Sequence, residues 1–211
     1  MNDTIDYYNQ NAEAFVKETL HADMNENRKR FLKYVRPGGK ILDAGCGSGR
    51  DALAFRQAGY QIDAFDASEE ICRLASENLG FSVRCLRFQD LEGKAEYDGI
   101  WACASLLHVS SEELPDVIQR LKKLLKPGGI LYASFKKGEG DRNKGGRYFQ
   151  DMTEEKMKDL FETAGLTVLE SYESADVRED RKEEKWVNVV GSLRRNKRLN
   201  VINMFYGGKD E

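Results

Sequence analysis

The strongest constraint in the sequence is a glycine-rich segment, Lys40-Ile-Leu-Asp-Ala-Gly-Cys-Gly-Ser-Gly-Arg50. Its apolar start predicts a buried strand, and the residues after the glycines, 50–58, predict a helix. A strand, a glycine turn and a helix N-terminus together let a ligand approach main-chain N–H groups closely. Asp43 ends the strand, and a loop built to hold a pyrophosphate gains nothing from a carboxylate there. The segment therefore favours a ligand with a cationic amino-acid group.

Helices and strands are expected to alternate along the rest of the chain. Because the last two strands are joined by a polar segment without a helix, we expect them to be antiparallel neighbours. The order predicts an α/β fold that is doubly wound, with a seven-stranded, mostly parallel sheet, an antiparallel last strand and helices on both faces. Helices are expected over residues 4–20, 25–35, 50–58, 68–79, 110–125 and 153–164, and strands over 41–43, 60–65, 82–87, 97–103, 130–135, 166–172 and 185–193.

Composition narrows the classes of partner. The formal net charge is −3, so no global basic field attracts nucleic acid. The four cysteines show no CxxC pairing and no nearby histidine, which argues against a metal site. The N-terminus has neither the basic nor the apolar region of a secretory signal, and no apolar run approaches a membrane span. We therefore expect a cytoplasmic protein with no membrane partner, and no sequence feature selects an oligomeric state.

Four segments occur in an order typical of one family. The glycine loop, residues 43–49, resembles the first motif of the class I S-adenosylmethionine-dependent methyltransferases, and the similarity covers roughly residues 30–193. Asp66, at the end of the second expected strand, matches the acid that holds the ribose hydroxyls. Gln89-Asp90-Leu91 matches the segment that reads the adenine, and residues 102–107 match the strand end beside the methionine portion. More loosely, the chain looks like the small-molecule or tellurite-resistance-type branch.

The resemblance implies S-adenosyl-L-methionine as cofactor, released as S-adenosyl-L-homocysteine. Asp66 follows the glycine loop by about twenty residues, the spacing at which a strand-end carboxylate can accept two ribose hydrogen bonds. Other readings stay open: Asp66 as a helix cap, Asp43 as a tie for the loop, Asp90 as a solvated acid and Arg50 as the ion-pair partner of Asp51. The expected cofactor residues are Tyr8, Asp43, Gly45, Gly47, Gly49, Arg50, Asp66, Ala67, Gln89, Asp90, Leu91 and Ala104.

Methyl transfer needs alignment and a dry pocket, and a general base only where the acceptor cannot shed its proton alone. His108 follows the fourth expected strand at the edge where open α/β sheets bind ligands, so it is the candidate base, or else a residue that caps a helix or lines the pocket. The resemblance also implies a helical lid over about residues 1–36. Its Tyr7 and Tyr8 would contact the ligands or pack in the core.

A long glycine- and charge-rich stretch, residues 136–147, is expected to be a flexible loop that closes over the acceptor or is merely solvated. The candidate substrate residues are Tyr7, His108, Arg147 and Tyr148. We expect one domain over residues 1–195, with a tail over 196–211.

The favoured acceptor is a small molecule, and three alternatives remain. The basic run Arg194-Arg-Asn-Lys-Arg198 and the 136–147 stretch would suit an RNA or tRNA methyltransferase, although a solvated surface explains them as well. A non-catalytic module that binds S-adenosylmethionine is the second. A nicotinamide-dependent oxidoreductase is the third; residues 47–52 fit a relaxed form of its pattern, but Arg50 replaces a required glycine if the pattern starts at Gly45.

Overall fold

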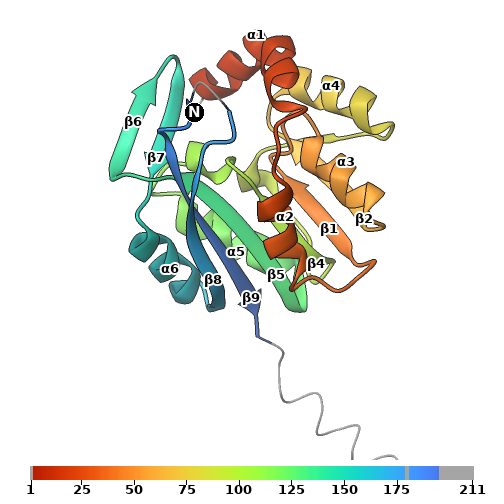
Figure 1. Ribbon diagram of the computed structural model, residues 1–211, viewed down its shortest axis with the longest axis vertical. Helices are drawn as coiled ribbons and strands as arrows, with labels where there is room; N and C mark the ends of the chain where they lie inside the picture. The colour runs from red at the N-terminus through yellow and green to blue at the C-terminus, as the bar shows by residue number, and fades with distance from the viewer. Residues whose placement is uncertain (1, 179–180, 195–211) are drawn as a thin grey trace, which may run out of the picture.

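A seven-stranded sheet forms the centre of the protein (Figure 1). The computed structural model describes residues 2–178 and 181–194. The strand order is β3-β2-β1-β4-β5-β9-β8; the first five are parallel, and β9 runs antiparallel to both β5 and β8. The predicted fold class is confirmed. The strands are β1 (Lys40–Ala44), β2 (Gln61–Asp66), β3 (Arg84–Cys85), β4 (Tyr97–Ala102), β5 (Leu125–Lys136), β8 (Leu166–Ala175) and β9 (Lys185–Leu193).

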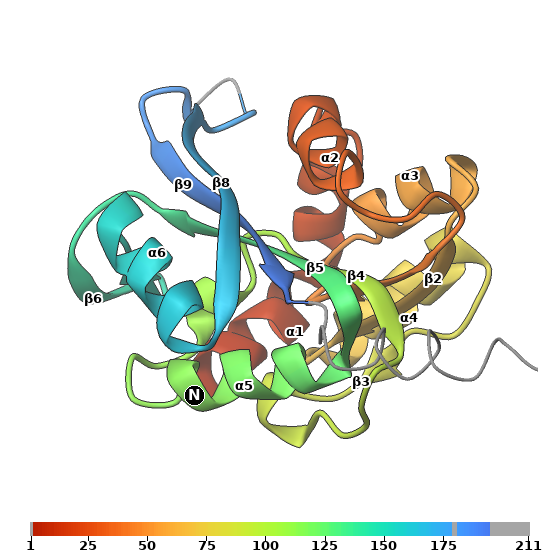
Figure 2. The ribbon, with the colours of Figure 1, turned by 90° about the horizontal axis from the view of Figure 1, so that it is seen from below.

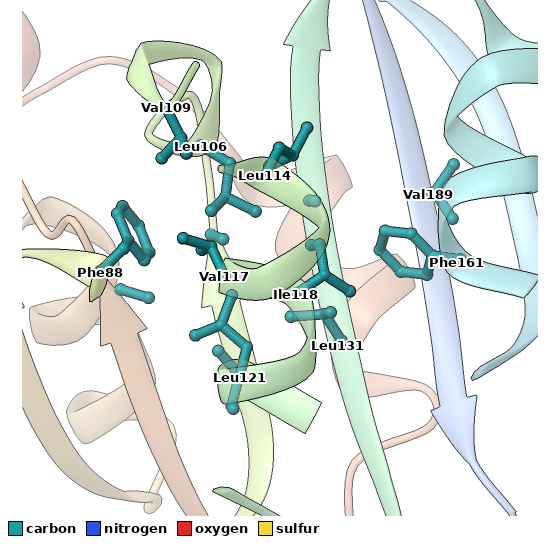
Figure 3. Close-up of a cluster of buried hydrophobic side chains, with 14 of the residues drawn as sticks. Phe88, Leu106, Val109, Leu114, Val117, Ile118, Leu121, Leu131, Phe161 and Val189 are labelled. Atoms are coloured by element: carbon teal, nitrogen blue, oxygen red, sulfur yellow. The ribbon is translucent and has the colours of Figure 1, made fainter. Parts of the chain in front are cut away.

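Helices cover both faces of this sheet, and Figure 2 shows α2 and α5 on opposite sides. On the face of α2 and α3, Phe31 and Phe55 pack around Trp101, which stacks on Tyr132 with ring centroids 3.8 Å apart. On the other face, leucine, isoleucine and valine side chains of α5 pack between the sheet and α6 (Figure 3). The helices are α1 (Asn2–Thr19), α2 (Asn25–Leu32), α3 (Arg50–Gln57), α4 (Glu69–Leu79), α5 (Leu114–Leu124) and α6 (Glu154–Thr163), with single 3-10 turns η1 (Phe88–Asp90) and η2 (Leu106–His108).

The expected flexible loop over residues 136–147 is wrong. The chain there forms an antiparallel hairpin of β6 (Gly140–Lys144) and β7 (Arg147–Asp151), visible beside α1 in Figure 1. Gly145 and Gly146 make its two-residue turn with φ of 58° and 75°, the left-handed pair that a tight hairpin requires. Charged residues on both strands hide the alternation of apolar and polar residues by which a strand is recognised in a sequence. The hairpin is nevertheless anchored, because Phe149 is buried against His108.

Several boundaries also differ from expectation; β5, for example, begins at Leu125 rather than at residue 130. The third strand is only two residues long, since the main-chain N–H of Val83 donates to the Ser76 hydroxyl rather than to a neighbouring strand. The helix expected from residue 110 begins at Leu114, because Ser110 and Glu113 close a turn of their own: the Ser110 hydroxyl donates to the Glu113 carboxylate over 2.8 Å. The tail over residues 196–211 and most of the basic run at 194–198 lie outside the described residues. No described helix is long and apolar enough to cross a membrane.

Candidate cofactor and acceptor site

A cavity of about 530 Å³ lies at the carboxyl ends of the parallel strands. Its walls come from the loop between β1 and α3, the ends of β2, β4 and β5, α1, the β6–β7 hairpin and the segment between β8 and β9. Among the residues selected from the sequence, the cavity is lined by Tyr8, Asp43, Gly45, Gly47, Arg50, Asp66, Ala67, Gln89, Ala104, His108 and Arg147. The structure does not bring five others to the cavity wall: Tyr7, Gly49, Asp90, Leu91 and Tyr148.

The glycine loop approaches its surroundings closely. A Cβ built on Gly45 would lie 2.5 Å from the Cβ of Ser105, so only glycine fits there. The Ser105 hydroxyl donates to the Ala44 carbonyl over 2.7 Å and so fixes the end of β4 against the loop. Gly49 has a structural role instead: with φ of 77° it precedes α3 and packs against Leu79.

Asp66 binds the glycine loop and also lines the cavity. Its carboxylate accepts the main-chain N–H of Gly47 over 3.0 Å and that of Ser68 over 3.1 Å. Burial raises the pKa of Asp66, and the hydrogen bonds from Gly47 and Ser68 oppose that rise. Ser68 itself caps α4 through the N–H of Ile71, so Asp66 is not the helix cap. The carboxylate has four lone pairs, so it keeps acceptor capacity for a ligand hydroxyl beside its main-chain donors, which also include Ala67.

Asp43 and Arg50 are both bound to neighbours inside the protein. The Asp43 carboxylate accepts the N–H of Ala52 over 3.0 Å, which holds the start of α3 against β1. Burial and the nearby charge of Asp51 raise the pKa of Asp43. Arg50 pairs with Asp51 over 2.6 Å, and Asp51 also accepts hydrogen bonds from Arg28 and Trp101. The alternatives of a loop tie for Asp43 and an ion pair for Arg50 therefore both hold, while each residue also lines the cavity.

The segment matched to adenine recognition is split in the structure. Gln89 lines the cavity and donates to Glu113 over 3.2 Å. Asp90 is exposed and pairs with Arg87 over 3.2 Å, so its carboxylate is held at the start of η1. Leu91 is buried in the core beside α5. Because η1 turns the chain here, three consecutive residues point to three different surroundings.

Tyr8 and His108 form a hydrogen bond across the cavity. The Nδ1 atom of His108 lies 2.7 Å from the Tyr148 carbonyl oxygen, which can only accept, so Nδ1 carries the proton. The Nε2 atom is then the acceptor for the Tyr8 hydroxyl, 3.0 Å away. Burial lowers the pKa of His108 to about 4, and the positive charge of Arg147 adds to the effect. The ring is therefore neutral near pH 7. Tyr148 acts through its main chain, while its own hydroxyl accepts from the N–H of Ser111.

The residues of the far wall of the cavity were not predicted from the sequence. This wall includes Trp186, whose indole N–H donates to Asp176 over 3.1 Å. The strand order did carry a signal for this wall. Because β8 runs in the same direction as β5, the end of β8, next to Asp176, lies at the same edge of the sheet as the glycine loop. The missed lining residues include Cys103, Ser105, Ser134, Lys136, Asp176, Arg178, Trp186 and Asn188. Among the described residues, no cluster of His, Cys, Asp and Glu could hold a metal ion.

Residues 16–171 match the family model described as a methyltransferase domain. The chain belongs to the methyltransferase domain family. This membership confirms the resemblance to the class I S-adenosylmethionine-dependent methyltransferases, a family of enzymes that use the expected cofactor.

Curated relatives of this methyltransferase-family chain match it over about 130 residues. A malonyl-[acyl-carrier protein] O-methyltransferase of Erwinia pyrifoliae is 32% identical over 128 residues, which are 56% of this chain and 47% of that protein. A ubiquinone biosynthesis O-methyltransferase of Xanthomonas campestris pv. campestris is 31% identical over 130 residues, 56% of this chain and 52% of the relative. This chain thus spans about half the length of the curated relatives it matches.

A solved structure shows the same fold over nearly the whole chain. The 1,6-didemethyltoxoflavin-N1-methyltransferase of Burkholderia thailandensis, with bound 1,6-didemethyltoxoflavin and S-adenosylhomocysteine, superposes with a TM-score of 0.73. The identity is 22%, and the match covers 90% of this chain and 85% of that one.

Proposed function

We propose that this protein transfers the methyl group of S-adenosylmethionine to a nucleophilic oxygen, nitrogen or sulfur atom of a small-molecule acceptor. One observation carries the proposal: a single cavity is lined by the glycine loop and Asp66 on one side and by α1 and the hairpin on the other. Thr4 of α1 accepts the main-chain N–H of Tyr148 over 3.0 Å, so these two covering elements are tied together. A small molecule fits beneath such a cover better than a long polymer does.

The cofactor supplies a methyl group activated on a sulfonium ion, and the chain supplies binding and orientation. Asp66 would accept the two ribose hydroxyls with its remaining acceptor capacity. Gly45 and Gly47 line the cavity without side chains, so the amino-acid end would approach the loop backbone closely.

The Tyr8–His108 pair would remove the acceptor's proton where one must leave. Because the Nε2 lone pair of His108 is occupied by the Tyr8 hydroxyl, the proton would pass to the Tyr8 oxygen as Tyr8 passes its own to Nε2. The pKa of His108, about 4, makes it a weak base. The pair therefore suits an acceptor that is acidic enough to give up its proton easily.

The names of the Xanthomonas and Burkholderia relatives support a small acceptor, whereas the malonyl group in the name of the Erwinia relative is carried by a protein. Both curated relatives are O-methyltransferases by name, which favours an oxygen atom as nucleophile. The Burkholderia enzyme is an N1-methyltransferase of a small heterocycle, so the fold also accommodates nitrogen acceptors.

The test is cofactor binding followed by transfer of labelled methyl groups. Calorimetry should give a Kd of about 1 μM or tighter for S-adenosylhomocysteine. Cofactor carrying a labelled methyl group is then incubated separately with a small-molecule extract and with total RNA. We expect label in the small-molecule arm. Label in the RNA arm alone would favour an RNA methyltransferase, and absence of S-adenosylhomocysteine binding would contradict the proposal altogether.

A further inference from the structure

The charges that line the cavity are distributed unevenly. The cofactor side carries Asp43, Asp51 and Asp66. Among the described lining residues of the opposite side, which is built from β5, the hairpin and the segment after β8, the acidic ones are Asp176 and Glu184, paired with Arg178 and Lys136. The cationic residues lining that opposite side are Lys136, Arg142, Lys144, Arg147, Arg178 and Arg181. An anion is therefore attracted to the side of the cavity away from the glycine loop.

Arg147 differs from the other arginines of the cavity. Arg142 pairs with Asp151 over 2.6 Å and Arg178 with Asp176 over 2.7 Å. Arg50, Arg87 and Arg181 also each have a carboxylate within 4 Å. No acidic side chain of the described residues lies within that distance of Arg147, and its Nε atom is buried without a hydrogen-bond partner.

Aromatic rings fix the orientation of this guanidinium group. Its central carbon lies 4.3 Å from the ring centroid of Tyr7, 5.2 Å from that of Phe149 and 5.9 Å from that of Tyr8. Rings packed around a guanidinium stabilise its charge but do not satisfy its N–H groups, which point outward in its own plane. The group is therefore held in place with donors to spare.

We propose that the acceptor carries a carboxylate and that Arg147 binds it; this inference rests on the proposed function. Leaving a charged donor buried and unpaired costs free energy, which a ligand that accepts its hydrogen bonds recovers. A carboxylate matches the planar fork of arginine with two parallel hydrogen bonds. Arg147 hydrogen-bonds the Tyr8 hydroxyl but has no acidic partner among the described residues, so its one positive charge matches a monoanionic carboxylate better than a phosphate dianion.

The position of Arg147 connects acceptor binding to the Tyr8–His108 pair. Burial is the main cause that lowers the pKa of His108, and the positive charge of Arg147 lowers this pKa further. A bound carboxylate neutralises that charge, so the pKa of His108 moves back toward its ordinary value. His108 thus becomes a better base when the acceptor is in place than when the cavity holds the cofactor alone.

The experiment follows the Arg147 side chain by NMR in protein saturated with S-adenosylhomocysteine. The ¹⁵N-bound Hε signal of Arg147 is assigned by its absence from the Arg147→Gln variant. The probes are acetate, benzoate and octanoate, each paired with its amide. We expect at least one carboxylate to shift this signal saturably and its amide not to. By calorimetry, the same carboxylate should bind Arg147→Gln at least tenfold more weakly than it binds the wild type. The control Arg73→Gln, which removes an exposed arginine of α4, should bind like the wild type.

Four outcomes would overturn the inference. The first is that none of the carboxylates shifts the Arg147 signal. The second is equal carboxylate affinity in the wild type and in Arg147→Gln. The third is a tenfold loss of S-adenosylhomocysteine affinity in Arg147→Gln, because the carboxylate bound by Arg147 would then belong to the cofactor. In the fourth, the wild type does not bind S-adenosylhomocysteine, and the proposed function fails together with the inference. The first three outcomes would contradict only this inference and would not contradict the proposed methyl transfer.

Discussion

Asp66 shows how one side chain can shape a loop and still be available to a ligand. Its carboxylate holds Gly47 and Ser68 by their N–H groups. Replacement by Asn puts an NH₂ group where one acceptor was, so we expect Asp66→Asn to weaken S-adenosylhomocysteine binding by about 1–3 kcal/mol in calorimetry. Asp63→Asn is the matched control, since Asp63 lies on the same strand but pairs with Lys40 outside the cavity. Equal losses in both variants would mean that Asp66 acts only through the stability of β2.

His108 is expected to matter for turnover more than for cofactor affinity. His108→Ala removes the acceptor of the Tyr8 hydroxyl proton, whereas Tyr8→Phe leaves the imidazole but removes the hydroxyl that connects it to the acceptor. A positioned acid or base contributes about 10²–10⁴-fold to a rate, so we expect both variants to lose activity by up to that range. Label transfer and calorimetry measure the two properties separately. Full activity in His108→Ala would mean that His108 has only a structural role.

The buried histidine also predicts a pH dependence of stability. The unfolded chain binds a proton on His108 near pH 6.5, but the folded protein does so only near pH 4. Between these values the unfolded state holds more protons, so the free energy of unfolding falls as the pH falls, by about 3 kcal/mol at most. Urea unfolding from pH 7 to pH 4 should show a shallower slope for His108→Gln than for the wild type. His21→Gln, at an exposed position, should keep the wild-type slope.

Among the elements, the β6–β7 hairpin places Arg147 over the cavity and Tyr148 next to His108. Gly145 has open space around it but a φ of 58°, so a β-branched side chain there is strained by backbone conformation alone. We expect Gly145→Val to speed amide hydrogen exchange across residues 140–151 and to reduce turnover, with S-adenosylhomocysteine affinity unchanged. Gly145→Asn, which tolerates this conformation, should behave like the wild type. Equal exchange in both variants would contradict a role for the turn.

The sequence predicted elements whose signals are local and missed those fixed by distant contacts. The glycine loop and Asp66 were found because strand ends in a parallel sheet meet at one edge, and the loop and Asp66 both belong to neighbouring strand–helix units. The orientation of Asp90 is an exception, because its partner Arg87 lies only three residues away and their pairing competes with any role of Asp90 in the cavity. The hairpin was taken for a loop because Phe149 needs His108, far away in the chain, to bury its ring.

At the scale of the whole molecule, Asp51 joins three elements in two layers, the helices α2 and α3 and the sheet. It accepts hydrogen bonds from Arg28 of α2, Arg50 of α3 and Trp101 of β4. Burial opposes its ionisation, but the charges of the two arginines outweigh it and lower the pKa of Asp51.

We expect Asp51→Ala to reduce the free energy of unfolding by about 3 kcal/mol, because it leaves two arginines without their acid in a largely buried place. Urea unfolding measures the loss. The control Asp90→Ala breaks an exposed ion pair, which contributes little to stability, so it should unfold like the wild type. A loss no larger in Asp51→Ala than in Asp90→Ala would show that Asp51 does not join the layers.

The cavity is closed by the first helix and by the last two strands together. Thr4 and Tyr8 lie near one end of the described chain, and Asp176 and Trp186 near the other. Synthesis must therefore pass β9 before the complete binding site can exist, although the glycine loop is made more than a hundred residues earlier. A truncated product that ends before β8 would keep the family's first motif but would lack one wall of the cavity. Tight ligand binding therefore reports that the chain has been translated through β9.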